Sequence, residues 1–159
     1  MIYKNKFTEE EIIAFDELKE YLEWNDSNLD TFIGLIKIIS DCTYDLVNSI
    51  TKAYGFIQMR ADWSQSLHRR NKSNTLGDLG RLSGAEQIKF FRSIFYNNHI
   101  KAKTKKDIIA CTLNLNPKAI PETIYNTQLQ YLPQYKFNRN LPLENFIKDL
   151  DKVIEEGKS

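Results

Sequence analysis

The longest amphipathic pattern lies in the first third of the chain. Two sets of residues each recur every seven positions, offset from one another by four: Phe32, Ile39, Leu46 and Ala53, and Ile36, Thr43, Ile50 and Ile57. This spacing predicts a long central helix over about residues 29–54. It is typical both of the central helix of an antiparallel bundle and of the seam of a coiled-coil homodimer. Leu35, Cys42 and Val47 widen the apolar stripe, which favours the bundle.

Shorter helical patterns flank this helix. Thr8 with Glu11, and Ser83 with Glu86, have the spacing of capping boxes, in which each side chain bonds the backbone of the other residue. Helices over residues 84–98 and 142–156 are expected to pack on the central one. We therefore predict an all-α fold: a single-domain bundle of six or seven helices over residues 1–159.

The clearest break in the helical patterns is residues 71–84, which hold three of the six glycines and several turn-forming residues. We interpret it as a loop or hinge. It subdivides the domain into N-terminal helices over residues 1–70 and C-terminal helices over residues 85–159.

Residues 104–132 carry the spacing of a helix-turn-helix. Thr104 caps a first short helix, and Pro121 opens a second one after a four-residue connection. Lys118 and Asn126 would then point outward near the start of the second helix, where asparagine suits adenine edges and lysine suits guanine or phosphate. The alternative is ordinary bundle structure with no contact to DNA.

Length and composition are those of a globular domain that needs no cross-links. The chain has 159 residues, 42% of them hydrophobic and 27% charged. The two cysteines, Cys42 and Cys111, match no metal or redox spacing, and we expect reduced, buried thiols. No apolar signal region or membrane span is recognised, so the predicted location is the cytoplasm.

Charge is sorted along the chain, although the net charge is only +1. Residues 1–59 carry five Lys or Arg against eleven Asp or Glu, a net of −6. Residues 60–106 carry eleven against three, a net of +8, and residues 107–159 carry six against seven, a net of −1. A basic block of this kind indicates a polyanionic partner. It can also be neutralised by the acidic beginning of the same chain.

The basic block suggests a surface for the phosphate backbone, with the aromatic residues Trp63, Phe90 and Tyr96 interleaved as stacking partners for single-stranded bases. The predicted nucleic-acid-binding residues are Arg60, Arg69, Arg70, Lys72, Lys89, Arg92, Lys101, Lys103, Lys105, Lys106, Lys118 and Asn126.

Arg92 and His99 are seven residues apart on one predicted helix and therefore share a face. The string R-S-I-F-Y-N-N-H resembles the Arg-x4–6-His motif of the HEPN family of ribonucleases. The resemblance covers these eight residues. It implies a helical protein in which the arginine and histidine of two protomers together cleave RNA.

No phosphate-binding glycine loop, metal-ligand spacing or catalytic triad is recognised, so no cofactor, metal or catalytic residue is predicted. The first hypothesis is a small cytosolic non-enzymatic protein, such as a regulator, that contacts nucleic acid through the basic central segment. The second is a helical protein-interaction module, such as a subunit, inhibitor or adaptor, that binds an acidic partner. The third is the HEPN-like ribonuclease.

Overall fold

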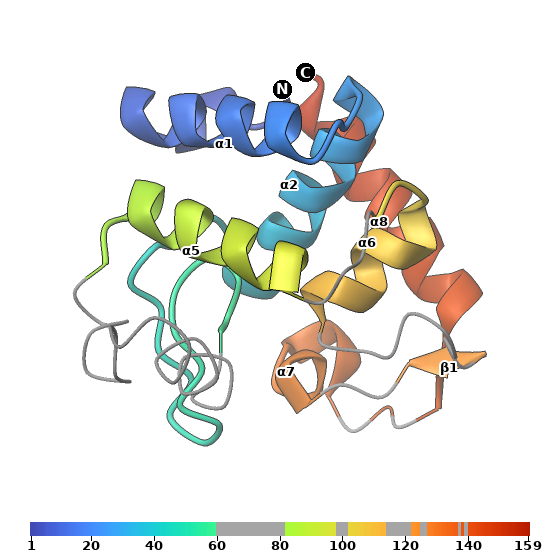
Figure 1. Ribbon diagram of the computed structural model, residues 1–159. Coiled ribbons are helices and arrows are strands. Elements are labelled where there is room, and N and C mark those ends of the chain that lie inside the picture. Colours follow the sequence, from blue (N-terminus) through green and yellow to red (C-terminus); the bar gives the residue numbers. More distant parts are fainter. Residues whose placement is uncertain (60–81, 98–101, 114–121, 125–126, 137, 139) are drawn as a thin grey trace.

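A computed structural model describes residues 1–59, 82–97, 102–113, 122–124, 127–136, 138 and 140–159 (Figure 1). The all-α prediction is confirmed at the level of class: within these residues six α-helices account for most of the chain, and the sheet is small. No helix in these ranges is both long enough and apolar enough to cross a membrane.

The elements follow one another along the chain with a short two-stranded sheet near the end. The helices are α1 (Glu9–Tyr21), α2 (Asp26–Ser40), α5 (Gly84–Asn97), α6 (Lys105–Thr112), α7 (Thr127–Gln130) and α8 (Leu143–Gly157), with 3-10 turns η1 (Lys4–Lys6) and η2 (Pro133–Tyr135). Strands β1 (Thr123–Ile124) and β2 (Leu141–Pro142) pair antiparallel, with Thr123 opposite Pro142.

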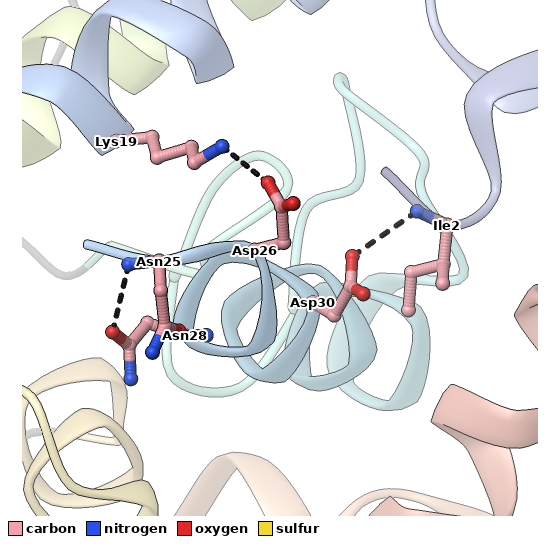
Figure 2. A network of polar contacts seen from close by, with 6 residues as sticks. All are labelled: Ile2, Lys19, Asn25, Asp26, Asn28 and Asp30. Atoms are coloured by element: carbon pink, nitrogen blue, oxygen red, sulfur yellow. Dashed lines mark hydrogen bonds and ion pairs between the residues drawn. The ribbon is translucent and has the colours of Figure 1, made fainter.

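Polar side chains fix the starts of the first two helices. Thr8 and Glu11 form the expected capping box at α1. Asn25 and Asn28 form a second one at α2, each side-chain oxygen accepting from the other residue's backbone N–H at 2.8–3.0 Å. Figure 2 shows this corner, where Lys19 of α1 also pairs with Asp26. These contacts satisfy N–H groups that have no partner inside the helix and set the angle between α1 and α2.

α2 lies at the centre of the fold, as predicted for the start of the long helix. Ten of its 15 residues are buried, and it packs against α1, α6 and α8 (Figure 1). The expected packing of the last helix on it is confirmed. α5 lies mainly along α1 and reaches α2 through Phe91, whose ring stacks on Phe32 with centroids 4.9 Å apart.

The prediction of one helix to about residue 54 is wrong, because α2 ends at Ser40. Asp41 and Cys42 have φ values of 50° and 61°, which a right-handed helix does not allow. The last backbone bond runs from Asp41 N–H to Lys37 O, and the two side chains form an ion pair there. Phe32, Ile36 and Ile39 are buried within the single chain, so they form its core and not a dimer seam.

The second helix of the predicted helix-turn-helix is also not formed as expected. α6 begins after Thr104, whose hydroxyl accepts from Asp107 N–H at 3.1 Å, which matches the prediction. Thr123 and Ile124, however, lie in β1, and α7 is only four residues long. Pairing with Leu141 and Pro142 therefore replaces the first turns of the expected reading helix. The connection, residues 117–120, and Asn126 lie outside the described residues.

Candidate functional site

The structure describes only some of the predicted nucleic-acid-binding residues. Arg60, Arg69, Arg70, Lys72, Lys101, Lys118 and Asn126 lie outside the described residues. The five described members come from α5 (Lys89 and Arg92), from the segment before α6 (Lys103) and from α6 (Lys105 and Lys106).

Three of these five side chains contact other groups of the protein. Lys103 Nζ lies 3.5 Å from Glu23 Oε2, and Lys105 Nζ lies 2.5 Å from Asp151 Oδ1. The guanidinium of Arg92 lies 4.8 Å from the centroid of the Tyr21 ring. Both ion pairs are partly exposed, and such pairs contribute only about 0–1 kcal/mol, so a stronger polyanion could displace the carboxylates.

Lys89 and Lys106 are exposed, and neither has an ion pair with any residue that the structure describes. They lie on two different helices, α5 and α6, which do not pack closely against each other. The described part of the basic block is therefore divided among several elements and partly neutralised by Glu23 and Asp151.

The pair of residues that resembles the ribonuclease motif is described only in part. Arg92 is half-buried, and its guanidinium stacks on Tyr21 of the neighbouring helix α1. A cation over an aromatic face is a stabilising contact in its own right. His99 lies outside the described residues.

A different surface stands out in the described part of the chain, and we call it the apolar patch. It consists of five exposed side chains: Tyr44, Leu46, Val47, Ile50 and Tyr131. Seven large apolar side chains are exposed in the described residues, and four of them fall within residues 44–50. Clustered exposed apolar groups mark interaction sites more often than single ones do.

The apolar patch borders a surface pocket of about 340 Å³. Its lining comes from the end of α2, from the segment after it and from the α7 region: Ile39, Leu46, Val47, Asn48, Ser49, Ile50, Gln58, Gln128, Tyr131 and Leu132. No Asp, Glu, Lys, Arg or His is among these residues. The volume is at the lower end of the range of about 300–1,000 Å³ that ligand pockets span, so it suits one or two side chains.

Gln87 of α5 positions the segment that carries the patch. Its side chain is fully buried, its Oε1 accepts from Phe56 N–H at 3.0 Å, and its Nε2 donates to Tyr44 O at 2.7 Å. Gly55 has a φ of +85°, and a Cβ at this position would lie 2.0 Å from Gln87 Oε1. Only glycine allows this close approach between the segment and the buried amide.

Polar side chains hold the turn at the edge of the pocket. Asn48 Oδ1 accepts from the N–H groups of Ile50 and Thr51 at 2.9 and 3.0 Å. Thr51 Oγ1 donates to Gln128 Oε1 of α7 at 3.0 Å, which joins the two sides of the pocket. Gln58 Nε2 donates to Leu46 O at 3.1 Å. The backbone of Ile50 is therefore fixed by hydrogen bonds, while its side chain is 64% exposed.

Both cysteines of the chain are free thiols in buried surroundings. Cys42 follows α2, and burial raises the pKa of its thiol to about 11. Burial likewise raises the pKa of the Cys111 thiol to about 12, so both are protonated at neutral pH. Among the described residues no cluster of His, Cys, Asp and Glu could hold a metal ion.

Sequence reasoning missed the apolar patch because it assigned Leu46, Val47 and Ile50 to a helical stripe. The signal against a helix was present in the residues between them. Asp41, Thr43, Asp45, Asn48, Ser49 and Thr51 form a run of side chains that bond the backbone and favour turns.

Comparisons of the chain with protein-family models, with curated proteins and with solved structures found no match.

Proposed function

We propose that this protein is a helical protein-interaction module that binds a partner protein through the apolar patch. The observation that carries the proposal is the concentration of exposed apolar side chains around an uncharged pocket. Val47 and Ile50 are 56% and 64% exposed, although the same chain buries every large apolar side chain of α2. Their burial in a complex would gain about 25 cal/mol for each Å² of apolar surface removed from water.

The electrostatics of the pocket support a protein partner over a nucleic acid at this site. No cation lines the pocket, and the closest charged residue in the sequence to its lining is Asp45, which repels phosphate. Interface centres are depleted of charge and enriched in aromatic residues such as tyrosine. The partner surface we expect here is apolar, in contrast to the acidic partner suggested by the basic block.

A matched pair of isoleucine variants tests the proposal. Ile50 lies in the apolar patch, whereas Ile13 is 51% exposed on α1 and is not among the residues that line the pocket. Immobilised wild type, Ile50→Asp and Ile13→Asp are incubated with lysate of the source cells. We expect at least one protein to be retained by wild type and by Ile13→Asp and to be lost with Ile50→Asp. Equal retention by all three proteins would contradict the proposal.

A second candidate, nucleic-acid binding, rests on the net charge of +8 over residues 60–106 and on the exposed side chains of Lys89 and Lys106. It uses a different part of the chain and is compatible with the first. Affinity for short duplex and single-stranded oligonucleotides should fall steeply as salt rises, and Lys89→Ala should lower the slope of log K against log salt by about 1. Absence of binding at low salt would remove this candidate.

A further inference from the structure

In the segment that carries the apolar patch, two isolated antiparallel β-bridges join three short stretches of chain, around Val47, Tyr54 and Met59. Asn48 N–H donates to Ala53 O at 2.9 Å and Gly55 N–H donates to Leu46 O at 2.8 Å, so Val47 faces Tyr54. Tyr54 in turn exchanges two hydrogen bonds with Met59, at 3.0 and 3.1 Å. Tyr54 therefore belongs to the middle stretch, and Val47 belongs to the edge.

The bonding pattern fixes where the backbone of Val47 points. When the residues that flank a facing pair carry the hydrogen bonds, the N–H and C=O of the pair itself point away from each other. Those of Tyr54 point to Met59. Those of Val47 point to the opposite side, and they take part in no hydrogen bond with any residue that the structure describes. An exposed strand edge of this kind is a template for another extended chain.

The pocket lies beside this edge. Leu46, Val47 and Ile50 line it from the edge side, and Tyr131 and Leu132 line it from the α7 side. An extended chain that pairs with Val47 alternates its side chains between two faces. One face is therefore directed at the pocket, which has room for an apolar side chain and no charge to oppose it.

We infer that an extended segment of a partner protein adds as a strand to the edge at Val47 and places one apolar side chain in the pocket. This mode combines main-chain hydrogen bonds with a side-chain pocket, which is how many peptide-binding domains work. The inference rests on the proposed function and names the kind of segment that the apolar patch receives.

Charge near the edge specifies the residues that flank the apolar anchor. Residues 41–50 contain Asp41 and Asp45 and no Lys or Arg. Asp41 pairs with Lys37, whereas Asp45 is exposed and has no ion pair with the described residues. The exposed Lys52 lies in the turn at the other end of the edge, where its N–H donates to Asn48 O at 2.8 Å. A segment with lysine or arginine on the Asp45 side of its apolar anchor is therefore favoured over one with an acidic residue there.

A displayed library of random heptapeptides, selected on the immobilised full-length chain, supplies the probes. The best binders are synthesised with a fluorescein label, and their affinity is measured by fluorescence polarisation. We expect an apolar anchor with a basic residue on one side of it. We expect Ile50→Asp to weaken binding at least tenfold and Ile13→Asp to change it less than twofold.

Backbone methylation separates strand addition from simple filling of the pocket. An N-methyl group on the one peptide amide that faces Val47 O removes a donor and should lower affinity at least tenfold. Methylation of either neighbouring amide, which points away from the edge, should change it less than twofold. If every methylated peptide binds like its parent while Ile50→Asp abolishes binding, strand addition is overturned and the proposed interaction surface remains.

Two other outcomes would also overturn the inference. The first is a selection that yields no peptide whose binding depends on Ile50, and the lysate experiment then decides the proposed function independently. The second is a wild-type protein that sediments as a dimer and becomes a monomer with Ile50→Asp, because the occupant of the edge is then a second copy of this chain.

Discussion

α2 and the segment directly after it, residues 41–59, use apolar side chains in different ways. α2 lies at the centre of the fold and buries ten of its 15 residues. Its backbone N–H and C=O groups bond to one another within the helix. The following segment buries Phe56, Ile57 and Met59 in its second half but exposes Leu46, Val47 and Ile50 in its first half. The same residue types form the core in one region and a surface in the other.

The difference follows from what each backbone bonds to. In α2 every turn is closed within the helix. In residues 41–59 a few backbone bonds are supplemented by side chains, namely Gln58 within the segment and Gln87 from α5. A segment held by a few polar contacts can present apolar side chains to solvent, whereas an amphipathic helix must bury them. The contrast therefore links the fold to the proposed interaction surface.

The largest effect is expected in the centre of the helices. Phe32 is fully buried and packs against Phe15, Trp24 and Phe91. Phe32→Ala should lower the free energy of unfolding by about 3–5 kcal/mol, because it removes apolar contacts and leaves a cavity. Urea denaturation followed by circular dichroism measures this loss. A loss below about 1 kcal/mol would show that α2 is not central to stability.

The next effect concerns the link between the two regions. Gln87→Leu removes the acceptor for Phe56 N–H and the donor to Tyr44 O. The buried Phe56 N–H left unpaired costs about 1–3 kcal/mol, whereas Tyr44 O lies near the surface and can bond water, so we expect a loss of about 1–3 kcal/mol. Hydrogen exchange should accelerate over residues 44–56 more than over α2. Lys89→Ala, an exposed change on the same helix, is the control and should leave exchange in both regions unchanged.

The helix starts could be predicted from the sequence, whereas the path of residues 44–56 after α2 could not. The starts of α1, α5 and α6 were predicted from Thr8, Ser83 and Thr104. Each of these side chains accepts a hydrogen bond from the amide three residues later, which is a purely local interaction. The path of residues 44–56 depends on Gln87, 31 positions beyond Phe56, and on Gly55, whose φ of +85° fits that contact. A seven-residue spacing contains no information about such a distant partner.

The candidate site was predictable to a smaller extent. The sequence located charge but not which cations are paired, since Lys105 meets Asp151 from the far end of the chain. The pocket escaped prediction for the same reason, because Gln128 and Tyr131 reach it from residues 127–132. Interaction surfaces assembled from distant segments require coordinates.

The two thiols allow the two regions to be compared by the pH dependence of stability. Cys111 lies in α6, which packs against α2, and Cys42 lies at the start of the segment that follows α2. Burial raises the pKa of each from 9.0, to about 12 for Cys111 and about 11 for Cys42. The folded state holds these protons more tightly. The stability they contribute is therefore complete below pH 9 and is lost as pH rises, at about 1.4 kcal/mol per pH unit for each thiol.

Single variants isolate this contribution from the titration of lysines and tyrosines. The free energy of unfolding of wild type, Cys42→Ala and Cys111→Ala is measured at half-unit steps from pH 8 to the highest pH at which wild type remains folded. The difference between wild type and Cys42→Ala should stop changing near pH 11, and that for Cys111→Ala should continue to change toward pH 12. Parallel curves for all three proteins would contradict the assigned burial.

The smallest effect on stability is expected at the apolar patch. Ile50 is 64% exposed, so Ile50→Ala should change the free energy of unfolding by less than about 0.5 kcal/mol. Ile57 is its matched control, seven residues further along the same apolar spacing but buried, and Ile57→Ala should cost about 2–5 kcal/mol. Urea denaturation of both variants measures the contrast. Equal losses would mean that Ile50 is covered in the free protein. If Ile50→Ala keeps its stability but no longer retains the partner, the Ile50 side chain contributes to binding. Folding alone gives no reason for an isoleucine to be exposed to water at this position.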